Sequence, residues 1–235
     1  MKKLILLAIS IVAFASCGKE STICQTEILL DYSLPESGSM SRGGAEIYAD
    51  FYNKYILSRK LTPTTYSLTF TNKSDQSKVE INDLWSKNNA LKLIAGTYKV
   101  EGYSRSTERD SDGGIDTLYL TFNEEIKIEA NTKKIVLNAI YDCSMLFFDA
   151  EGVKEAYYYY GTNNGYSRTR DLASLDQIYY CFAQTINTAT DEIRIKKITG
   201  SAKLGIGKMN IQKGKYYYFG NAESDYNIPK MDEGI

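Results

Sequence analysis

Apolar residues alternate with polar ones over most of the chain, in short runs separated by turn-forming residues. In the first run, 27–34, apolar side chains recur at every second position, the pattern of a β-strand with one face on a core. Further strands are predicted at 66–70, 78–81, 90–94, 97–103, 117–122, 125–130, 133–139, 144–149, 153–160, 177–184, 192–198, 203–209 and 215–219. No long helical pattern interrupts these runs, so we predict an all-β fold.

One segment before the second strand does not follow the alternation. Tyr48, Phe51, Tyr52, Tyr55 and Ile56 lie at helical spacing. The same segment is rich in aromatic residues, which favour strands, so both structures stay open.

Two stretches of the chain resemble each other at a constant offset of 118 residues. The matching positions are Leu91, Leu93, Gly96, Tyr98, Val100 and Gly102 with Met209, Ile211, Gly214, Tyr216, Tyr218 and Gly220. Each stretch combines two alternating runs with a turn glycine, a pattern typical of related domains in tandem. We predict an N-terminal β-sandwich domain over 27–140 and a C-terminal one over 141–235.

The N-terminus has the pattern of an export signal. Lys2 and Lys3 precede an apolar run at 4–15, which is too short for a permanent membrane-spanning helix. Small residues then lead to Cys17. We predict a cleaved signal peptide over 1–16, and an ordinary signal with a nearby cysteine is the alternative to a lipoprotein signal.

The residues before Cys17 resemble the lipobox of bacterial lipoproteins. This resemblance implies that Cys17 becomes the first residue and carries acyl chains such as palmitate, with 17–26 as a lipidated tether. Several acyl chains on one cysteine give a stable membrane anchor. Gly18-Lys19-Glu20 resembles the export tag of Bacteroidetes surface lipoproteins, which implies a location on the outer face of the outer membrane.

Charge and composition exclude several classes of function. Loss of Lys2 and Lys3 with the signal leaves 26 of the 28 basic residues and all 29 acidic residues, which gives a formal charge of −3. The basic residues form no block, so we do not expect nucleic acid as a partner. The chain has no histidine, which removes Ser-His-Asp triads, Cys-His dyads and histidine metal sites. Glu124 and Glu125 are neighbours on a strand and point to opposite faces. We expect no catalytic residues, metal or cofactor.

The cysteines and aromatic residues leave alternatives open. Cys143 and Cys181 lie in apolar strand-like runs and form either a disulfide between strands or two buried thiols, while Cys24 is left over. Trp85 is either a stacking platform for a sugar, together with Tyr157 and Tyr159, or a plug at one end of a sandwich.

Two loops have sequences of possible functional interest. The segment 35–44 is rich in Pro, Gly and Ser and is predicted to be an exposed loop, in which Arg42 is either a site of proteolytic maturation or an ordinary solvated arginine. The segment 109–114 superficially resembles a calcium loop, but its spacing favours a hairpin tip.

The lipobox, the tandem β pattern, the hairpin at 95–100 and the strand pair within 126–139 resemble the fimbrillin-like surface lipoproteins of Bacteroidetes. This resemblance implies two tandem Greek-key, transthyretin-like β-sandwich domains and a cleavage after an arginine near the N-terminus. It implies a non-catalytic adhesin or pilus-associated subunit, with other surface proteins as partners through strand addition. The alternative function is glycan binding at the cell surface through Trp85 and the tyrosine runs.

Overall fold

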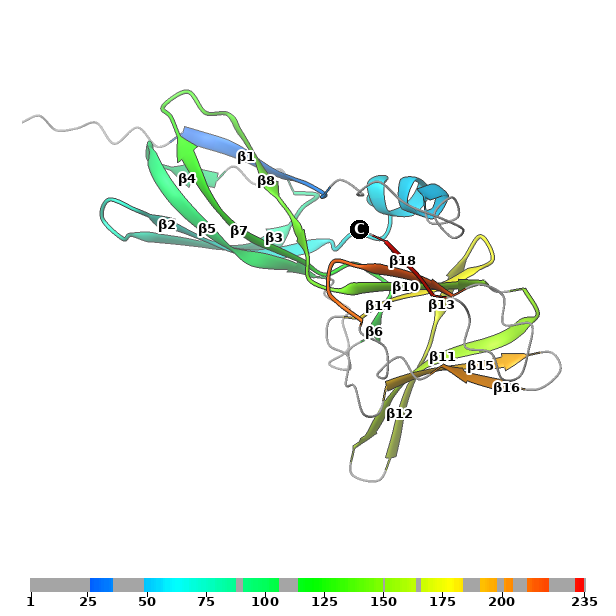
Figure 1. Cartoon of the computed structure of the whole chain (residues 1–235). Helices are drawn as coiled ribbons and strands as arrows, with labels where there is room; N and C mark the ends of the chain where they lie inside the picture. The colour runs from blue at the N-terminus through cyan, green and yellow to red at the C-terminus, as the bar shows by residue number, and fades with distance from the viewer. Residues whose placement is uncertain are drawn as a thin grey trace, which may run out of the picture.

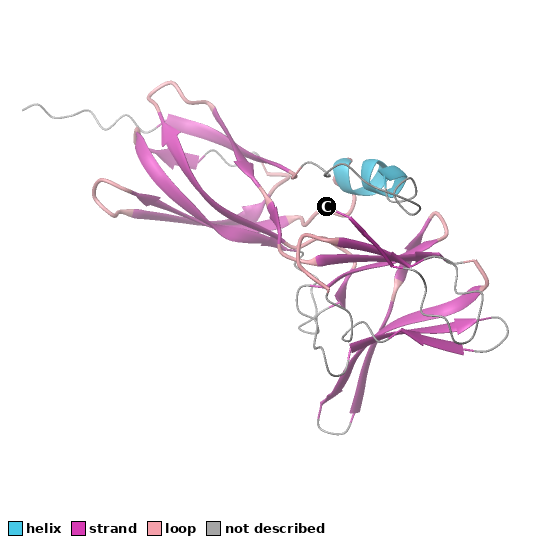
Figure 2. Cartoon of the chain, in the orientation of Figure 1, coloured by secondary structure: helices cyan, strands magenta, loops and turns pink. Residues whose placement is uncertain are grey.

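We describe the protein from a computed structural model, which describes residues 26–35, 49–87, 91–105, 114–149, 151–163, 166–183, 191–197, 201–204, 211–219 and 231–234. The predictions for Cys17, Cys24, Arg42 and 109–113 lie outside these residues. The fold is built from strands with one short helix (Figure 2), so the prediction of an all-β chain is confirmed.

The elements in chain order are β1 (Thr26–Ser33), η1 (Tyr52–Leu57), β2 (Thr65–Asn72), β3 (Lys78–Leu84), β4 (Leu91–Leu93), β5 (Gly96–Arg105), β6 (Gly114–Ile115), β7 (Leu120–Ile128), β8 (Lys134–Asn138), β9 (Ile140–Tyr141), β10 (Ser144–Asp149), β11 (Val153–Asn163), β12 (Tyr166–Asp171), β13 (Ala173–Leu175), β14 (Ile178–Ala183), β15 (Asp191–Lys197), β16 (Ser201–Leu204), β17 (Tyr216–Phe219) and β18 (Met231–Gly234). The segment with ambiguous periodicity forms η1, a π-helix. No helix among the described residues is long and apolar enough to cross a bilayer.

The first sandwich consists of a three-stranded sheet, β4-β1-β8, packed on a five-stranded sheet, β3-β2-β5-β7-β9 (Figure 1). The alternation read from the sequence sets which side chains lie between these sheets. Ile28 and Tyr32 of β1 face Phe70 of β2 and Phe122 of β7 in one buried cluster. Burial of these large apolar side chains is the main favourable term for the sandwich.

The second sandwich consists of the sheet β13-β14-β10-β17-β18, with β6 also paired to β14, and the four-stranded sheet β12-β11-β15-β16. Leu146, Cys181 and Tyr217 of the larger sheet pack between the two layers with Tyr158 and Ile193 of the smaller one. The short strand β6 comes from residues before the expected boundary at 140, yet it pairs with β14.

In the larger sheet of the second sandwich, strand β10 is buried on both faces, which explains why it is apolar without alternation. The second face of this sheet packs toward η1 and the first sandwich. The residues on this face are Met145, Phe147, Tyr180, Phe182, Tyr216 and Tyr218. The ring of Phe51 lies 4.9 Å from that of Phe147 and 5.4 Å from that of Tyr180, measured between centroids. This face, η1 and the interior of the first sandwich therefore form one continuous cluster, called the shared core below, whereas the interior of the second sandwich is a separate cluster.

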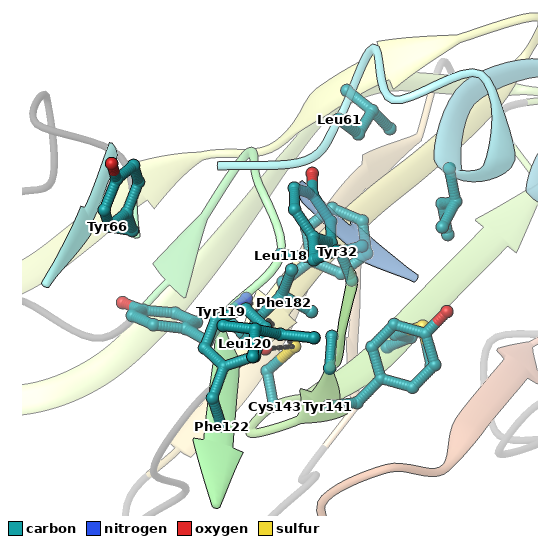
Figure 3. Packing of buried hydrophobic residues seen from close by; sticks show 14 of the residues in the cluster. Tyr32, Leu61, Tyr66, Leu118, Tyr119, Leu120, Phe122, Tyr141, Cys143 and Phe182 are labelled. Carbon is teal, nitrogen blue, oxygen red and sulfur yellow. Dashed lines mark hydrogen bonds between the residues drawn. The ribbon is translucent and has the colours of Figure 1, made fainter. Parts of the chain in front are cut away.

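Figure 3 shows this shared core near the start of the second sandwich. The thiol of Cys143 lies beside the backbone of Tyr119, with 3.5 Å from the Tyr119 nitrogen to the sulfur. Leu118, Leu120 and Phe182 surround it and are almost fully buried. The segment 118–120 therefore packs against the start of the second sandwich, at the point where the two sandwiches meet.

The two stretches that resemble each other at an offset of 118 residues have different neighbours in the structure. β5 lies inside the five-stranded sheet, antiparallel to both β2 and β7. β17 is parallel to β10 and antiparallel to β18. The resemblance between the two stretches therefore reflects similar local alternation of apolar and polar residues, and the two stretches are not equivalent strands.

Candidate functional site

The first strand of the fold is held by two different partners. Residues 26–28 of β1 pair antiparallel with β4, and residues 29–33 pair parallel with β8. β1 is therefore the central strand of its sheet, and its removal would leave β4 and β8 without the neighbour that joins them. Within the described residues, β1 is the only element that precedes Arg42 in the chain.

Ion pairs fix the outer side of β1. The carboxylate of Asp31 accepts from the guanidinium of Arg59 at 2.8 Å and from the ammonium of Lys134 at 2.9 Å. Burial raises the pKa of Asp31, but hydrogen bonds from Lys134 and Arg59 outweigh it and lower this pKa from 3.8 to about 2. Asp31 is therefore a carboxylate at neutral pH and ties β1 to both β8 and the segment after η1.

Arg59 makes three contacts with β1. Its second guanidinium nitrogen donates to the Tyr32 carbonyl at 2.5 Å, and its central carbon lies 4.3 Å from the centre of the Tyr32 ring. Its backbone φ is 63°, a left-handed conformation that costs free energy for a residue with a side chain. Sequence reasoning missed Asp31, Arg59 and Lys134, because they are far apart in the chain and form no motif.

Trp85 directly follows β3 and packs against the core of the first sandwich. Its ring centroid is 4.3 Å from Tyr66, 4.5 Å from Tyr32 and 5.9 Å from Phe122. The indole nitrogen donates to the hydroxyl of Ser104 at 2.8 Å. These contacts pack the ring against the interior of the first sandwich, and its role as plug or stacking platform stays a prediction.

Tyr157 and Tyr159 lie on β11, away from Trp85 and on another sheet. Tyr158 between them faces the core, so the two rings are on the outer face of the sheet, where both are half-buried. The Arg194 guanidinium covers Tyr159 at 3.6 Å from the ring centre, and Tyr157 donates to Glu155. Trp85 thus shares neither sheet nor packing cluster with these rings, and ligand stacking on them stays a prediction.

Cys143 and Cys181 are both free and buried in the structure. Cys143 packs in the shared core, whereas Cys181 faces the interior of the second sandwich. Residue 181 is opposite Leu146 in the β10–β14 ladder, which places it three positions along the strand from Cys143. Such a separation of about 10 Å along a strand exceeds the reach of a disulfide.

The described residues contain no group of three acidic or cysteine side chains placed to hold a metal ion. The neighbouring carboxylates of β7 have separate partners. Glu124 accepts from the side chain of Asn138 at 2.8 Å, and Glu125 pairs with Lys73 at 2.7 Å. They do not converge on one site.

No protein-family model matches the chain, and none of the curated proteins matches it in sequence. Among solved structures, a candidate cell adhesion protein from Bacteroides uniformis is similar at 8% identity and a TM-score of 0.45, covering 73% of this chain and 90% of that one. A fimbrial assembly protein from Parabacteroides distasonis has 13% identity and a TM-score of 0.44, covering 86% and 93%. A candidate cell adhesion protein from Bacteroides ovatus has 10% identity and a TM-score of 0.44, covering 90% and 98%. At this level of likeness they carry no inference about the function of this chain.

Proposed function

We propose that this chain is a non-catalytic surface lipoprotein, anchored to the outer membrane through Cys17, that acts as an adhesin or pilus-associated subunit. Cleavage after Arg42 would release the lipid and β1 together, since both precede Arg42 in the chain. The place of β1 between β4 and β8 is the observation that supports this proposal.

Loss of β1 would leave a groove with defined chemistry. The side chains of Ile28 and Tyr32 are 0% and 2% exposed, and Leu30 is packed against the same core. An incoming strand would have to place apolar side chains at these alternate positions and pair in parallel with β8. An extended segment of another subunit with a period of two meets these requirements, which is strand addition to an open sheet.

An unboiled denaturing gel of the outer-membrane fraction, blotted for this chain, tests the proposal. A polymer subunit gives a ladder of regular bands that starts from a monomer beginning at residue 43. Arg42→Ala should abolish the ladder and leave one lipid-bearing band. Arg105→Ala removes an exposed arginine elsewhere and is the matched control, for which the ladder should persist.

The outcomes separate the two roles contained in the proposal. A single band of the size expected from residue 17, unchanged in Arg42→Ala, would refute strand exchange and leave a permanently anchored adhesin. Labelling of the cells with a radioactive fatty acid reports the anchor independently. Absence of label from the wild-type chain, together with normal label on another lipoprotein, would refute lipidation of Cys17.

A further inference from the structure

A cavity of about 590 Å³ lies where η1 meets the β13–β14 hairpin of the second sandwich. Asp50, Phe51, Asn53 and Lys54 line it from the helical segment, and Asp176 and Ile178 line it from the hairpin. Its volume falls in the range of about 300 to 1,000 Å³ that small-molecule sites occupy.

Two polar side chains of this cavity have their hydrogen-bonding groups available. Among the described residues, neither the Asp50 carboxylate nor the Asn53 amide has a hydrogen-bond or ion-pair partner, and both residues are exposed. They are three positions apart in the helical segment, and both line the same cavity. Together they offer carboxylate and amide acceptors and an amide donor.

The other charged groups of the cavity are already paired with each other. Lys54 forms an ion pair with Asp176, and hydrogen bonds from Lys54 and Tyr55 hold the pKa of Asp176 below its ordinary value. These contacts hold the hairpin against the helical segment. Asp50 is therefore the one lining charge without a partner among the residues described, and the cavity offers no unpaired cation to an anionic ligand.

The floor and the backbone of the cavity are fixed. Phe51 and Ile178 are 3% and 8% exposed, so they form an apolar base that packs into the shared core. The hairpin turn has φ of 49° at Asp176 and 62° at Gln177, both left-handed. π-helical turns such as η1 are rare and occur often at functional sites.

We propose that this cavity binds a neutral oligosaccharide, with Asp50 and Asn53 hydrogen-bonding adjacent hydroxyl groups and the apolar base contacting the ring carbons. A carboxylate accepts from two hydroxyls at once, and an amide both donates and accepts, which fits a diol better than a single charged group. The site differs from Trp85, Tyr157 and Tyr159. It also differs from the groove of β1, so it is independent of polymer formation.

Binding of the full chain in detergent to an array of neutral tri- to hexasaccharides of glucose, mannose, galactose and xylose tests this proposal, with sialyllactose and immobilised putrescine as charged probes. Calorimetry with the best neutral binder then gives Kd. We expect Asp50→Asn and Asn53→Ala each to weaken binding about tenfold, because each change removes a hydrogen bond to a hydroxyl group of the ligand. Glu80→Gln removes an exposed carboxylate on β3 that has no ion pair among the described residues, and it should leave Kd unchanged.

Thermal unfolding of each variant should show an intact fold, since the side chains of Asp50 and Asn53 have no hydrogen-bond or ion-pair partner in the part of the chain that the structure describes. Binding of only putrescine or only sialyllactose would overturn the proposal, as would the absence of any binding. Neutral binding that both variants retain within twofold would also overturn it. The gel ladder is a separate readout, so failure here does not affect the proposal for β1.

Discussion

Replacement of Asp31 by Asn tests whether ion pairs hold β1 in its sheet. Burial raises the pKa of Asp31, but hydrogen bonds from Lys134 and Arg59 bring it from 3.8 to about 2. A lowering of this size corresponds to at most about 2.5 kcal/mol of folding free energy. The side chains of Arg59 and Lys134 are 45% and 54% exposed, so screening by water reduces the expected contribution to about 1 to 2 kcal/mol.

The sign of the pH dependence follows from the lowered pKa. The stabilisation is fully present above the unfolded pKa near 4 and is lost as the pH falls through about 2, where the native carboxylate is protonated. Urea unfolding at neutral pH should therefore show Asp31→Asn to be about 1 to 2 kcal/mol less stable than the wild type. The difference should shrink between pH 4 and pH 2.

Hydrogen exchange of β1 locates the effect. The amides of 29–33 should exchange faster in Asp31→Asn, whereas those of β11 should not change. Glu80→Gln, which removes an exposed carboxylate without an ion pair among the described residues, is the control and should match the wild type. Equal stability of Asp31→Asn and wild type at neutral pH, with the same pH dependence, would refute the role assigned to these ion pairs.

Three further substitutions and one labelling experiment test the packing of the fold. Phe147→Ala should lower the free energy of unfolding by about 3 to 5 kcal/mol, measured by denaturant unfolding, because the ring is 1% exposed in the shared core. Gly102→Ala should destabilise by more than about 2 kcal/mol, since an added Cβ would meet the Ser67 carbonyl at 2.1 Å, whereas Gly152→Ala, with nothing within 4 Å, should cost about 1 kcal/mol of backbone strain. Cys143 should resist alkylation at pH 8 in the native protein, because burial raises its pKa to about 12, and should react in urea, as read by peptide mass spectrometry.

The local alternation of apolar and polar residues was enough to predict most strands, because it arises wherever one face of a strand packs on a core. The run at 27–34 corresponds to β1 and the runs at 66–70 and 97–103 fall within β2 and β5. The parallel pairing of β1 with β8 joins residues more than 100 positions apart, and no local pattern records it. Periodicity is also uninformative for a strand that is buried on both faces. The apolar run of β10 predicts a strand, but it does not show that a second face of the sheet packs on another part of the protein.

Residues of the candidate sites were harder to predict for the same reason. The sequence singles out Trp85 because it is the one tryptophan of the chain. Whether it acts as a plug or a platform depends on its contacts with Tyr32 and Tyr66, which lie on other strands. Asp50 and Asn53 are ordinary polar residues on a helical segment, and only the hairpin that packs beside them makes a cavity. When a site is formed by elements that are distant in sequence, its residues show no characteristic spacing along the chain.

The arrangement of the shared core bears on what cleavage after Arg42 would do. η1 begins at Tyr52, beyond the cut, and Phe51 packs on Phe147, so the junction between the sandwiches would stay in the cleaved chain. The cut would remove β1 with Ile28 and Tyr32, together with the Asp31 carboxylate that pairs with Arg59 and Lys134. Both basic groups would then border an apolar groove. An incoming strand with an acidic residue at the place of Asp31 would restore the ion pairs, so Asp, rather than Lys, at that position of a synthetic strand peptide should favour its binding to the cleaved protein.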